Sequence, residues 1–141
     1  MEIIIGHGID IVDINRIEKS RKRSGSDFEV RCFTATERSV TQHDINSNQY
    51  FAGRFAAKEA VLKALGTGWS QGIAWTDIEI QRLPTGEPLV VLYGKCQEIA
   101  NKLGITKWLL SISHTNPFAI ASAIAIKTAS LEDNNTSQAT E

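Results

Sequence analysis

Two carboxylates in unlike settings are the first candidates for chemistry. Asp10 shares one face of an apolar opening segment with Gly6 and Gly8, whereas Glu59 stands among alanines, four residues before Lys63. Carboxylates that meet can hold a hard divalent cation, and magnesium typically takes one or two of them and completes its shell with water and phosphate oxygens. These residues therefore indicate magnesium and a phosphate-bearing substrate. An intrahelical pair between Glu59 and Lys63 explains their spacing equally well.

A histidine and a basic segment supply further candidates. His114 begins a polar loop after a strand-like segment, where sites often occur, although a purely structural histidine is the simpler interpretation. Residues 16–23 carry five basic side chains against only Glu18, a local charge of +4 that could steer an acidic protein partner. Solvated surface is the other interpretation. Nucleic acid is a poorer one, because no aromatic residues interleave with these bases.

Composition limits the class of protein. The chain has 141 residues and a net charge of -1, which predicts one domain and gives no overall case for binding nucleic acid or a membrane surface. Cys32 and Cys96 match neither a disulfide framework nor a zinc spacing, which indicates a reducing compartment. No signal-peptide pattern opens the chain, and no window reaches the roughly 18 apolar residues of a membrane helix. We therefore expect a cytoplasmic protein.

The pattern of apolar residues predicts an α+β fold. A strand over residues 3–12 is followed by the basic helix, for which Asp13 is the expected N-cap. The most periodic segment predicts a largely buried helix over 48–65, closed by Gly66. Shorter elements are expected in the remaining segments: a helical element within 28–40 capped by Thr34 or Thr36, a hairpin of 74–82 and 89–93, a helix over 95–103 and a strand over 108–113.

The last strand, residues 118–126, carries four alanines on one face, against which the alanine-rich helix could pack closely. Hairpin signals outnumber strand-helix-strand alternation, so the expected architecture is an antiparallel sheet packed around the long buried helix. Residues 1–126 are predicted to form a single domain. The polar segment 127–141 is predicted to be a disordered tail.

Three segments in this order resemble one family: Gly8-Ile9-Asp10-Ile11-Val12, Phe55-Ala56-Ala57-Lys58-Glu59-Ala60 continuing to Lys63-Ala64-Leu65-Gly66, and Ser111-Ile112-Ser113-His114-Thr115. The family is holo-[acyl-carrier-protein] synthase, a small 4′-phosphopantetheinyl transferase. Two further segments are similar to it as well, Arg31-Cys32-Phe33-Thr34 with Glu37 and Gly86-Glu87-Pro88. The likeness covers residues 3–126, and such motifs in this order and in a chain of this length are highly specific.

The resemblance implies transfer of the 4′-phosphopantetheine arm from coenzyme A to a serine of apo acyl carrier protein, with Mg2+ required and adenosine 3′,5′-bisphosphate released. It implies the 4′-phosphopantetheinyl transferase fold and a homotrimer with sites between subunits. It assigns Asp10 and Glu59 to the metal, and Asp10, Glu59 and Lys63 to catalysis. Coenzyme A contacts are implied at Arg54, Lys63, Gly66, Pro88, His114 and Thr115. Carrier contacts are implied on the basic helix, at Arg16, Arg21 and Arg23.

Three alternatives stay open at this point. The proton acceptor for the attacking serine is Glu59 or a water held by the metal. The client is a carrier of fatty acid biosynthesis, and so of lipid metabolism, or a carrier of secondary metabolism. A protein of another class, a catalytically silent trimeric module that binds carrier protein, is also compatible with the basic helix.

Overall fold

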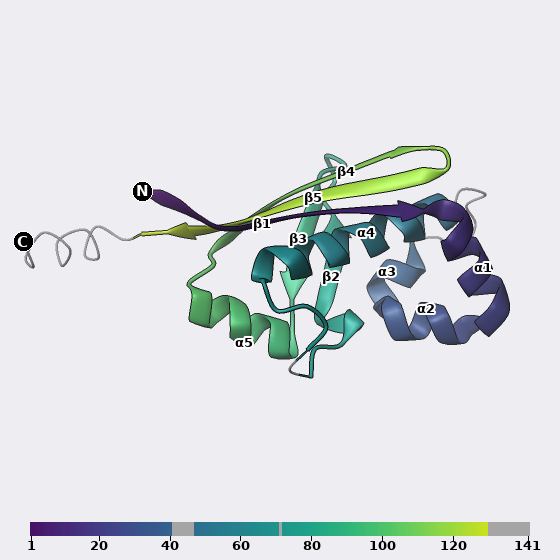
Figure 1. Cartoon of the computed structure of the whole chain (residues 1–141), viewed down its shortest axis with the longest axis horizontal. Coiled ribbons are helices and arrows are strands. Elements are labelled where there is room, and N and C mark those ends of the chain that lie inside the picture. Colours follow the sequence, from purple (N-terminus) through teal and green to yellow (C-terminus); the bar gives the residue numbers. More distant parts are fainter. Residues whose placement is uncertain (41–46, 71, 130–141) are drawn as a thin grey trace, which may run out of the picture.

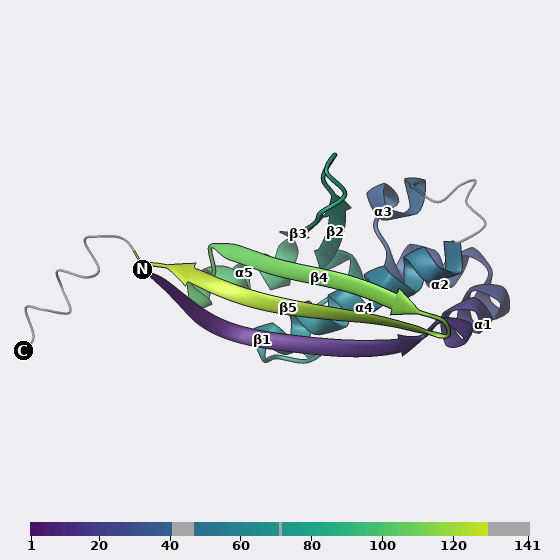
Figure 2. The same ribbon diagram turned by 90° about the horizontal axis from the view of Figure 1, so that it is seen from above.

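A three-stranded antiparallel sheet and one long helix form the two main layers of the protein (Figures 1 and 2). The computed structural model describes residues 1–40, 47–70 and 72–129. The sheet has the strand order β1 (Glu2–Asp13), β5 (Phe118–Thr128) and β4 (Lys107–Thr115), and helix α4 (Ser47–Leu65) runs along one of its faces. The expected α+β architecture, with an antiparallel sheet packed on a long buried helix, is confirmed.

The other elements lie around the two layers. Three short helices occupy the end of the molecule at which β1 finishes: α1 (Ile14–Ser24), α2 (Ser26–Cys32) and α3 (Ala35–Ser39). After α4 come a 3-10 turn η1 (Trp75–Asp77), the hairpin of β2 (Ile78–Arg82) and β3 (Pro88–Leu92), and helix α5 (Gly94–Leu103). Figure 2 shows the hairpin on the β4 side of the sheet.

Small residues let α4 approach the sheet closely. The inward alanines of β5 (Ala119, Ala121, Ala123 and Ala125) are all buried. A Cβ atom on Gly8 would lie 1.9 Å from the carbonyl oxygen of Ala60, and one on Gly6 would lie 2.0 Å from that of Ala64. Only glycine fits at these two positions. The glycines of β1 therefore make room for the backbone of α4, and not for a ligand.

The helix boundaries follow from capping residues. Asp13 caps α1 by accepting a hydrogen bond from the backbone N–H of Asn15 at 2.9 Å. Thr34 and Glu37 form a capping box at the start of α3, so the expected single element within 28–40 is two helices separated at Phe33 and Thr34. Gly66 follows α4 with a φ of +79°, as the predicted helix end requires.

Three strand boundaries differ from those expected by two residues or more. The strand predicted from residue 74 begins at Ile78, because Asp77 accepts a hydrogen bond from the N–H of Ala74 and closes a turn there. His114 and Thr115 belong to β4 and not to a loop, since both pair with β5. Strand β5 continues past residue 126 to Thr128, and residues 130–141 of the predicted tail lie outside the described residues.

A fully buried ion pair joins α4 to the short helices and the hairpin. The ammonium of Lys58 donates to Glu37 Oε1 at 2.7 Å, to the carbonyl oxygen of Cys32 at 2.8 Å and to that of Trp75 at 3.2 Å. Glu37 also accepts from the backbone N–H groups of Thr34 and Ile80, both at 2.9 Å. All three ammonium protons are thus used, which a buried charge requires. Burial nevertheless lowers the pKa of Lys58.

The outer face of the sheet exposes large apolar side chains among the polar His7, Ser111, Ser113 and Ser122, and Figure 2 looks onto this face. Its large outward side chains, each at least 36% exposed, are Ile9, Ile11, Leu109, Phe118 and Ile120. Soluble monomers rarely leave so many apolar side chains side by side in contact with water. Within the described residues, no helix has the length and hydropathy needed to cross a membrane.

Candidate active site

Asp10 and Lys63 form an ion pair between β1 and α4. The ammonium of Lys63 lies 3.1 Å from Asp10 Oδ1 and donates to the carbonyl oxygen of Ile9 at 2.9 Å. The Asp10 side chain is 18% exposed and that of Lys63 is 53% exposed, so the carboxylate lies deeper than the ammonium. The alternative interpretation, an intrahelical pair of Glu59 with Lys63, is not what forms.

Glu59 lies near the same place on α4. Gly6 faces Ala64 and Gly8 faces Ala60, so an advance of two residues along β1 corresponds to one turn, about four residues, of α4 in the reverse direction. The same spacing carries Asp10 past the turn of residues 56–59, which contains Glu59. Glu59 is half-buried, and its Oε1 accepts a hydrogen bond from the indole Nε1–H of Trp69 at 3.1 Å. The structure thus pairs Asp10 with Lys63, and Glu59 lies one helical turn before Lys63 on α4.

The chemistry of this donor set fits magnesium. No cluster of three or more Asp, Glu, His or Cys side chains that could hold a metal occurs among the described residues. Magnesium needs only one or two carboxylates when waters and phosphate oxygens supply its other ligands. Asp10 and Glu59 meet that requirement, and the polarity of their neighbours, Lys63 and Trp69, suits an anionic substrate.

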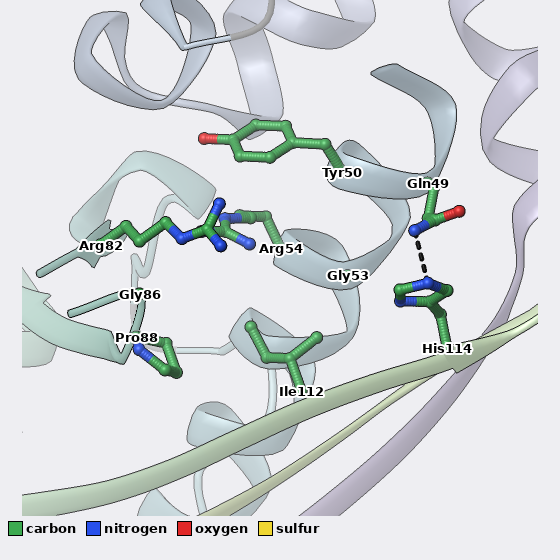
Figure 3. Close-up of a pocket in the computed structure, with 9 residues that line it drawn as sticks. All are labelled: Gln49, Tyr50, Gly53, Arg54, Arg82, Gly86, Pro88, Ile112 and His114. Carbon is green, nitrogen blue, oxygen red and sulfur yellow. Dashed lines mark hydrogen bonds between the residues drawn. The ribbon is translucent and has the colours of Figure 1, made fainter. Parts of the chain in front are cut away.

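A cavity of about 340 Å³ lies on the opposite flank of α4 (Figure 3). Three residues predicted to contact coenzyme A line it, namely Arg54, Pro88 and His114. The other lining residues are Gln49, Tyr50, Gly53, Arg82, Gly86 and Ile112. They come from α4, from β4 and from the β2–β3 hairpin, so elements far apart in the sequence form one pocket with two guanidinium groups.

Arg54 is the most unusual group in this cavity. Its guanidinium carbon lies 4.4 Å from the ring centre of Tyr50, and Figure 3 shows the guanidinium of Arg82 beside it. The Nε atom of Arg54 is buried and has no hydrogen-bond partner. Burial lowers the pKa of Arg54, and the neighbouring charge of Arg82 lowers it further. A cation held this way favours an anion that supplies the missing interactions.

His114 is oriented by a residue that sequence analysis did not single out. The side-chain amide of Gln49 donates to Nε2 of His114 at 2.6 Å (Figure 3). The bond joins the first turn of α4 to the end of β4 and holds the imidazole at the rim of the cavity. A neutral ring with an accepting Nε2 carries its proton on Nδ1.

Three residues expected at the coenzyme A site do not line this cavity, namely Lys63, Gly66 and Thr115. Thr115 pairs with Phe118 and, because neighbouring strand residues alternate, points to the opposite face of the sheet from His114. Gly66 is exposed at the end of α4, beyond Lys63. Its position belongs with the flank of Asp10 and Glu59 and not with the cavity.

The basic helix α1 divides into exposed and internal charges. Arg16 and Arg23 are exposed, as expected for a docking surface. Arg21 is only 21% exposed, pairs with Glu29 at 2.6 Å, and also donates to Ser47 and Asn48. Its guanidinium lies 4.6 Å from the ring centre of Phe51. Arg21 therefore connects α1, α2 and α4, and its expected role as a carrier contact stays a prediction.

Arg82, Tyr50 and Trp69 were not predicted as site residues, yet each contacts one that was. Arg82 had a usable signal, because it lies two residues before the Pro-Thr-Gly-Glu-Pro turn, and basic residues near such turns can meet phosphate. Trp69 and Tyr50 had none. Their positions depend on how the chain packs after Gly66 and on which side of α4 meets the hairpin.

The likeness of this chain to known proteins agrees with the geometry. Residues 6–123 match the family model described as the 4′-phosphopantetheinyl transferase superfamily. The holo-[acyl-carrier-protein] synthase of Koribacter versatilis is 45% identical over 122 residues, covering 86% of this chain and 98% of the relative. That of Desulforudis audaxviator is 45% identical over 124 residues, with coverage of 88% and 94%.

Solved structures show the same likeness. The holo-ACP synthase of Plasmodium yoelii matches with a TM-score of 0.80 and 35% identity, covering 92% of this chain and 99% of that one. The Helicobacter pylori holo-[acyl-carrier-protein] synthase in complex with coenzyme A matches with a TM-score of 0.74 and 36% identity, with coverage of 84% and 98%. The protein belongs to the holo-[acyl-carrier-protein] synthase family, within the 4′-phosphopantetheinyl transferase superfamily.

Proposed function

We propose that this protein transfers the 4′-phosphopantetheine group from coenzyme A to a serine of apo acyl carrier protein. The observation that carries the proposal is the ion pair of Asp10 with Lys63, one helical turn from Glu59 on α4, within a chain of this family. The relatives are named for this activity, and one solved neighbour is a complex with coenzyme A.

In the proposed reaction, the serine oxygen attacks the phosphorus atom that carries the pantetheine arm. A new oxygen–phosphorus bond forms, the bond from that phosphorus to the bridging oxygen breaks, and adenosine 3′,5′-bisphosphate leaves. Glu59 is the carboxylate best placed to accept the serine proton, either directly or through a water molecule. Lys63, whose side chain is about half exposed, can reach the diphosphate and neutralise the charge that develops on it.

We further propose that Asp10 and Glu59 hold Mg2+. The bound ion would neutralise the charge of the diphosphate oxygens, which is the main requirement of phosphoryl transfer. The partial burial of Asp10 helps to fix its carboxylate, and its pairing with Lys63 keeps a cation beside the substrate phosphates.

The cavity around Arg54 is the proposed site for the nucleotide end of coenzyme A. Arg54, Arg82 and His114 present donors suited to a phosphate, and Pro88 supplies an apolar wall. In a single chain this cavity and the carboxylates lie on opposite flanks of α4, because Ile112 of the cavity and Asp10 pair with opposite edges of the same residue, Ala121. A single coenzyme A molecule would therefore contact the cavity of one copy of the chain and the carboxylates of another.

This separation supports the proposed homotrimer with sites between subunits. The outer face of the sheet, with its exposed Ile9, Ile11, Leu109, Phe118 and Ile120, is the surface that we propose as the subunit contact. Assembly would bury this face and bring the cavity of one copy to the carboxylates of the next. The partner copy then completes the site instead of merely stabilising it.

The exposed basic face of α1 is the proposed docking surface for the acidic carrier. Arg16, Lys19 and Arg23 are separated by three and four residues and lie on one side of the helix. Their charge would mainly accelerate association. The free buried thiols of Cys32 and Cys96 support the proposed cytoplasmic location, because neither forms a disulfide.

An intact-mass assay tests the proposal. Apo carrier protein incubated with coenzyme A, magnesium chloride and this protein should gain the mass of one phosphopantetheine arm, and Asp10→Ala should nearly abolish that gain. No mass gain with any carrier tested would favour the silent carrier-binding module. Comparing rates on a fatty acid carrier and on a secondary-metabolism carrier distinguishes the two clients.

A further inference from the structure

We propose that Trp69 is a positioning residue that holds the Glu59 carboxylate through its indole N–H. The kinetic part of this inference rests on the proposed transferase function, whereas the contact itself does not. Trp69 Nε1–H donates to Glu59 Oε1 at 3.1 Å, within the ordinary range for a hydrogen bond of this kind. An indole N–H only donates, so Trp69 cannot take the serine proton itself.

The loop after α4 is built to return Trp69 to the helix. Gly66 and Gly68 adopt φ angles of +79° and +61°, which turn the chain back after the last helical residue. The hydroxyl of Ser70 donates to the carbonyl oxygen of Thr67 at 2.7 Å and fixes the turn around Trp69. The indole thus arrives beside a residue that lies ten positions earlier in the sequence.

A stack of rings fixes the orientation of this indole. The rings of Trp69 and Trp75 have centres 3.8 Å apart, and Trp75 stacks on Phe55 with centres 4.5 Å apart and planes inclined by 27°. Phe55 and Glu59 are four residues apart on α4 and therefore share a side of it. Phe55 of α4 contacts Trp75, Trp75 contacts Trp69, and Trp69 binds Glu59 of α4. Helix α4 therefore positions the indole that binds its own carboxylate.

The bond would leave one carboxylate oxygen free to act. Among the described residues, only Trp69 donates a hydrogen bond to Glu59, and it does so at Oε1. Oε2 is left for a metal ion or for the serine proton. A glutamate side chain without such a partner samples several rotamers, and a catalytic group loses efficiency when it is out of place by even about 1 Å.

Trp69→Phe tests the function of the bond, since it keeps a ring in the stack but removes the N–H. Loss of a partner that orients a metal-binding carboxylate typically costs about 10-fold or more, so kcat should fall about 10-fold in the mass-transfer assay. The KM for coenzyme A should stay unchanged, because the cavity lies on the other flank. The matched control is Trp108→Phe on β4, which makes the same substitution outside the ring stack, and its kcat should stay near that of the parent.

Nuclear magnetic resonance tests the contact without any turnover. The protein has three tryptophans, so its indole ¹H–¹⁵N spectrum contains three signals, and Trp69→Phe identifies that of Trp69. Glu59→Ala should move the Trp69 signal upfield and leave that of Trp108 in place. Addition of magnesium chloride to the parent should also move the Trp69 signal, and less so in Glu59→Ala.

Either of two results would overturn the inference. One is a kcat for Trp69→Phe equal to that of Trp108→Phe at equal thermal stability. The other is a chemical shift of the Trp69 indole signal that is the same in Glu59→Ala as in the parent. If the parent protein modifies no carrier, the proposed function fails, and the spectral comparison still decides whether Trp69 holds Glu59.

Discussion

The substitution Gly8→Ala should disable the active site through the backbone, without removing any reactive group. The added Cβ would lie 1.9 Å from the carbonyl oxygen of Ala60, whereas real Cβ atoms essentially never come closer than 3.0 Å to such an atom. Strand β1 and helix α4 must therefore separate by about 1 Å at this point. Asp10 is two residues further along β1, so it moves away from Glu59 and Lys63.

The size of the effect can be worked from this displacement. A shift of about 1 Å in catalytic geometry costs on the order of 100-fold in rate. Forcing one extra carbon into a packed contact costs about 1–3 kcal/mol of folding free energy. For a chain of this size that loss lowers the melting temperature by about 3–9 °C. The variant should therefore remain folded at room temperature and lose most of its transfer activity.

The assay compares Gly8→Ala with Gly6→Ala. A Cβ on Gly6 meets the carbonyl oxygen of Ala64 at 2.0 Å, an almost equal overlap that lies twice as many residues from Asp10. Both variants should lose similar stability in urea, whereas kcat should fall further in Gly8→Ala. A Gly8→Ala protein with the parent's rate and stability would refute the reasoning that glycine sets the contact between β1 and α4.

Three further predictions follow from the described contacts. Lys58→Met leaves the Glu37 carboxylate buried without its cation and should lower the free energy of unfolding, measured in urea, by about 3–5 kcal/mol. Adding Glu37→Gln should restore part of that loss. A double variant that loses as much stability as Lys58→Met alone would contradict the ion-pair argument. Burial raises the pKa of Cys96 to about 11, so its thiol should not react with a disulfide reagent at about pH 8 until the protein unfolds, and fast labelling of the folded protein would contradict its burial. Arg16→Glu combined with Arg23→Glu should slow association with the acidic carrier and flatten its salt dependence, with kcat little changed; equal association rates at low salt would refute the docking surface.

Local patterns predicted most elements because local chemistry decides them. The alanine-rich stretch predicted α4, its end at Gly66 and its contact with the alanines of β5, since small side chains on both surfaces favour close packing. Asp13 and Thr34 mark helix starts by capping. The start of β2 was missed because the Asp77 side chain binds the backbone of Ala74 and stabilises a turn where the sequence alone reads as strand.

The candidate site was predictable in its residue types but not in its partners. Asp10, Glu59 and Lys63 could be named from spacing and resemblance, whereas the pairing of Lys63 with Asp10 instead of Glu59 depends on how β1 crosses α4. The sequence alone does not distinguish Arg21 from the other basic residues of α1. Only the packing of α2 and α4 shows that its charge is used internally.

The uncovered side of the sheet changes how loss-of-function variants should be interpreted. If each reaction centre is completed by an adjoining copy, polar substitutions at outward positions such as Ile11 and Ile120 would weaken oligomerisation and silence the enzyme from a distance. Such variants would behave like active-site mutants in a turnover screen while every reactive side chain stayed intact. Measuring sedimentation as well as turnover would distinguish variants that lose a reactive side chain from variants that lose subunit contacts.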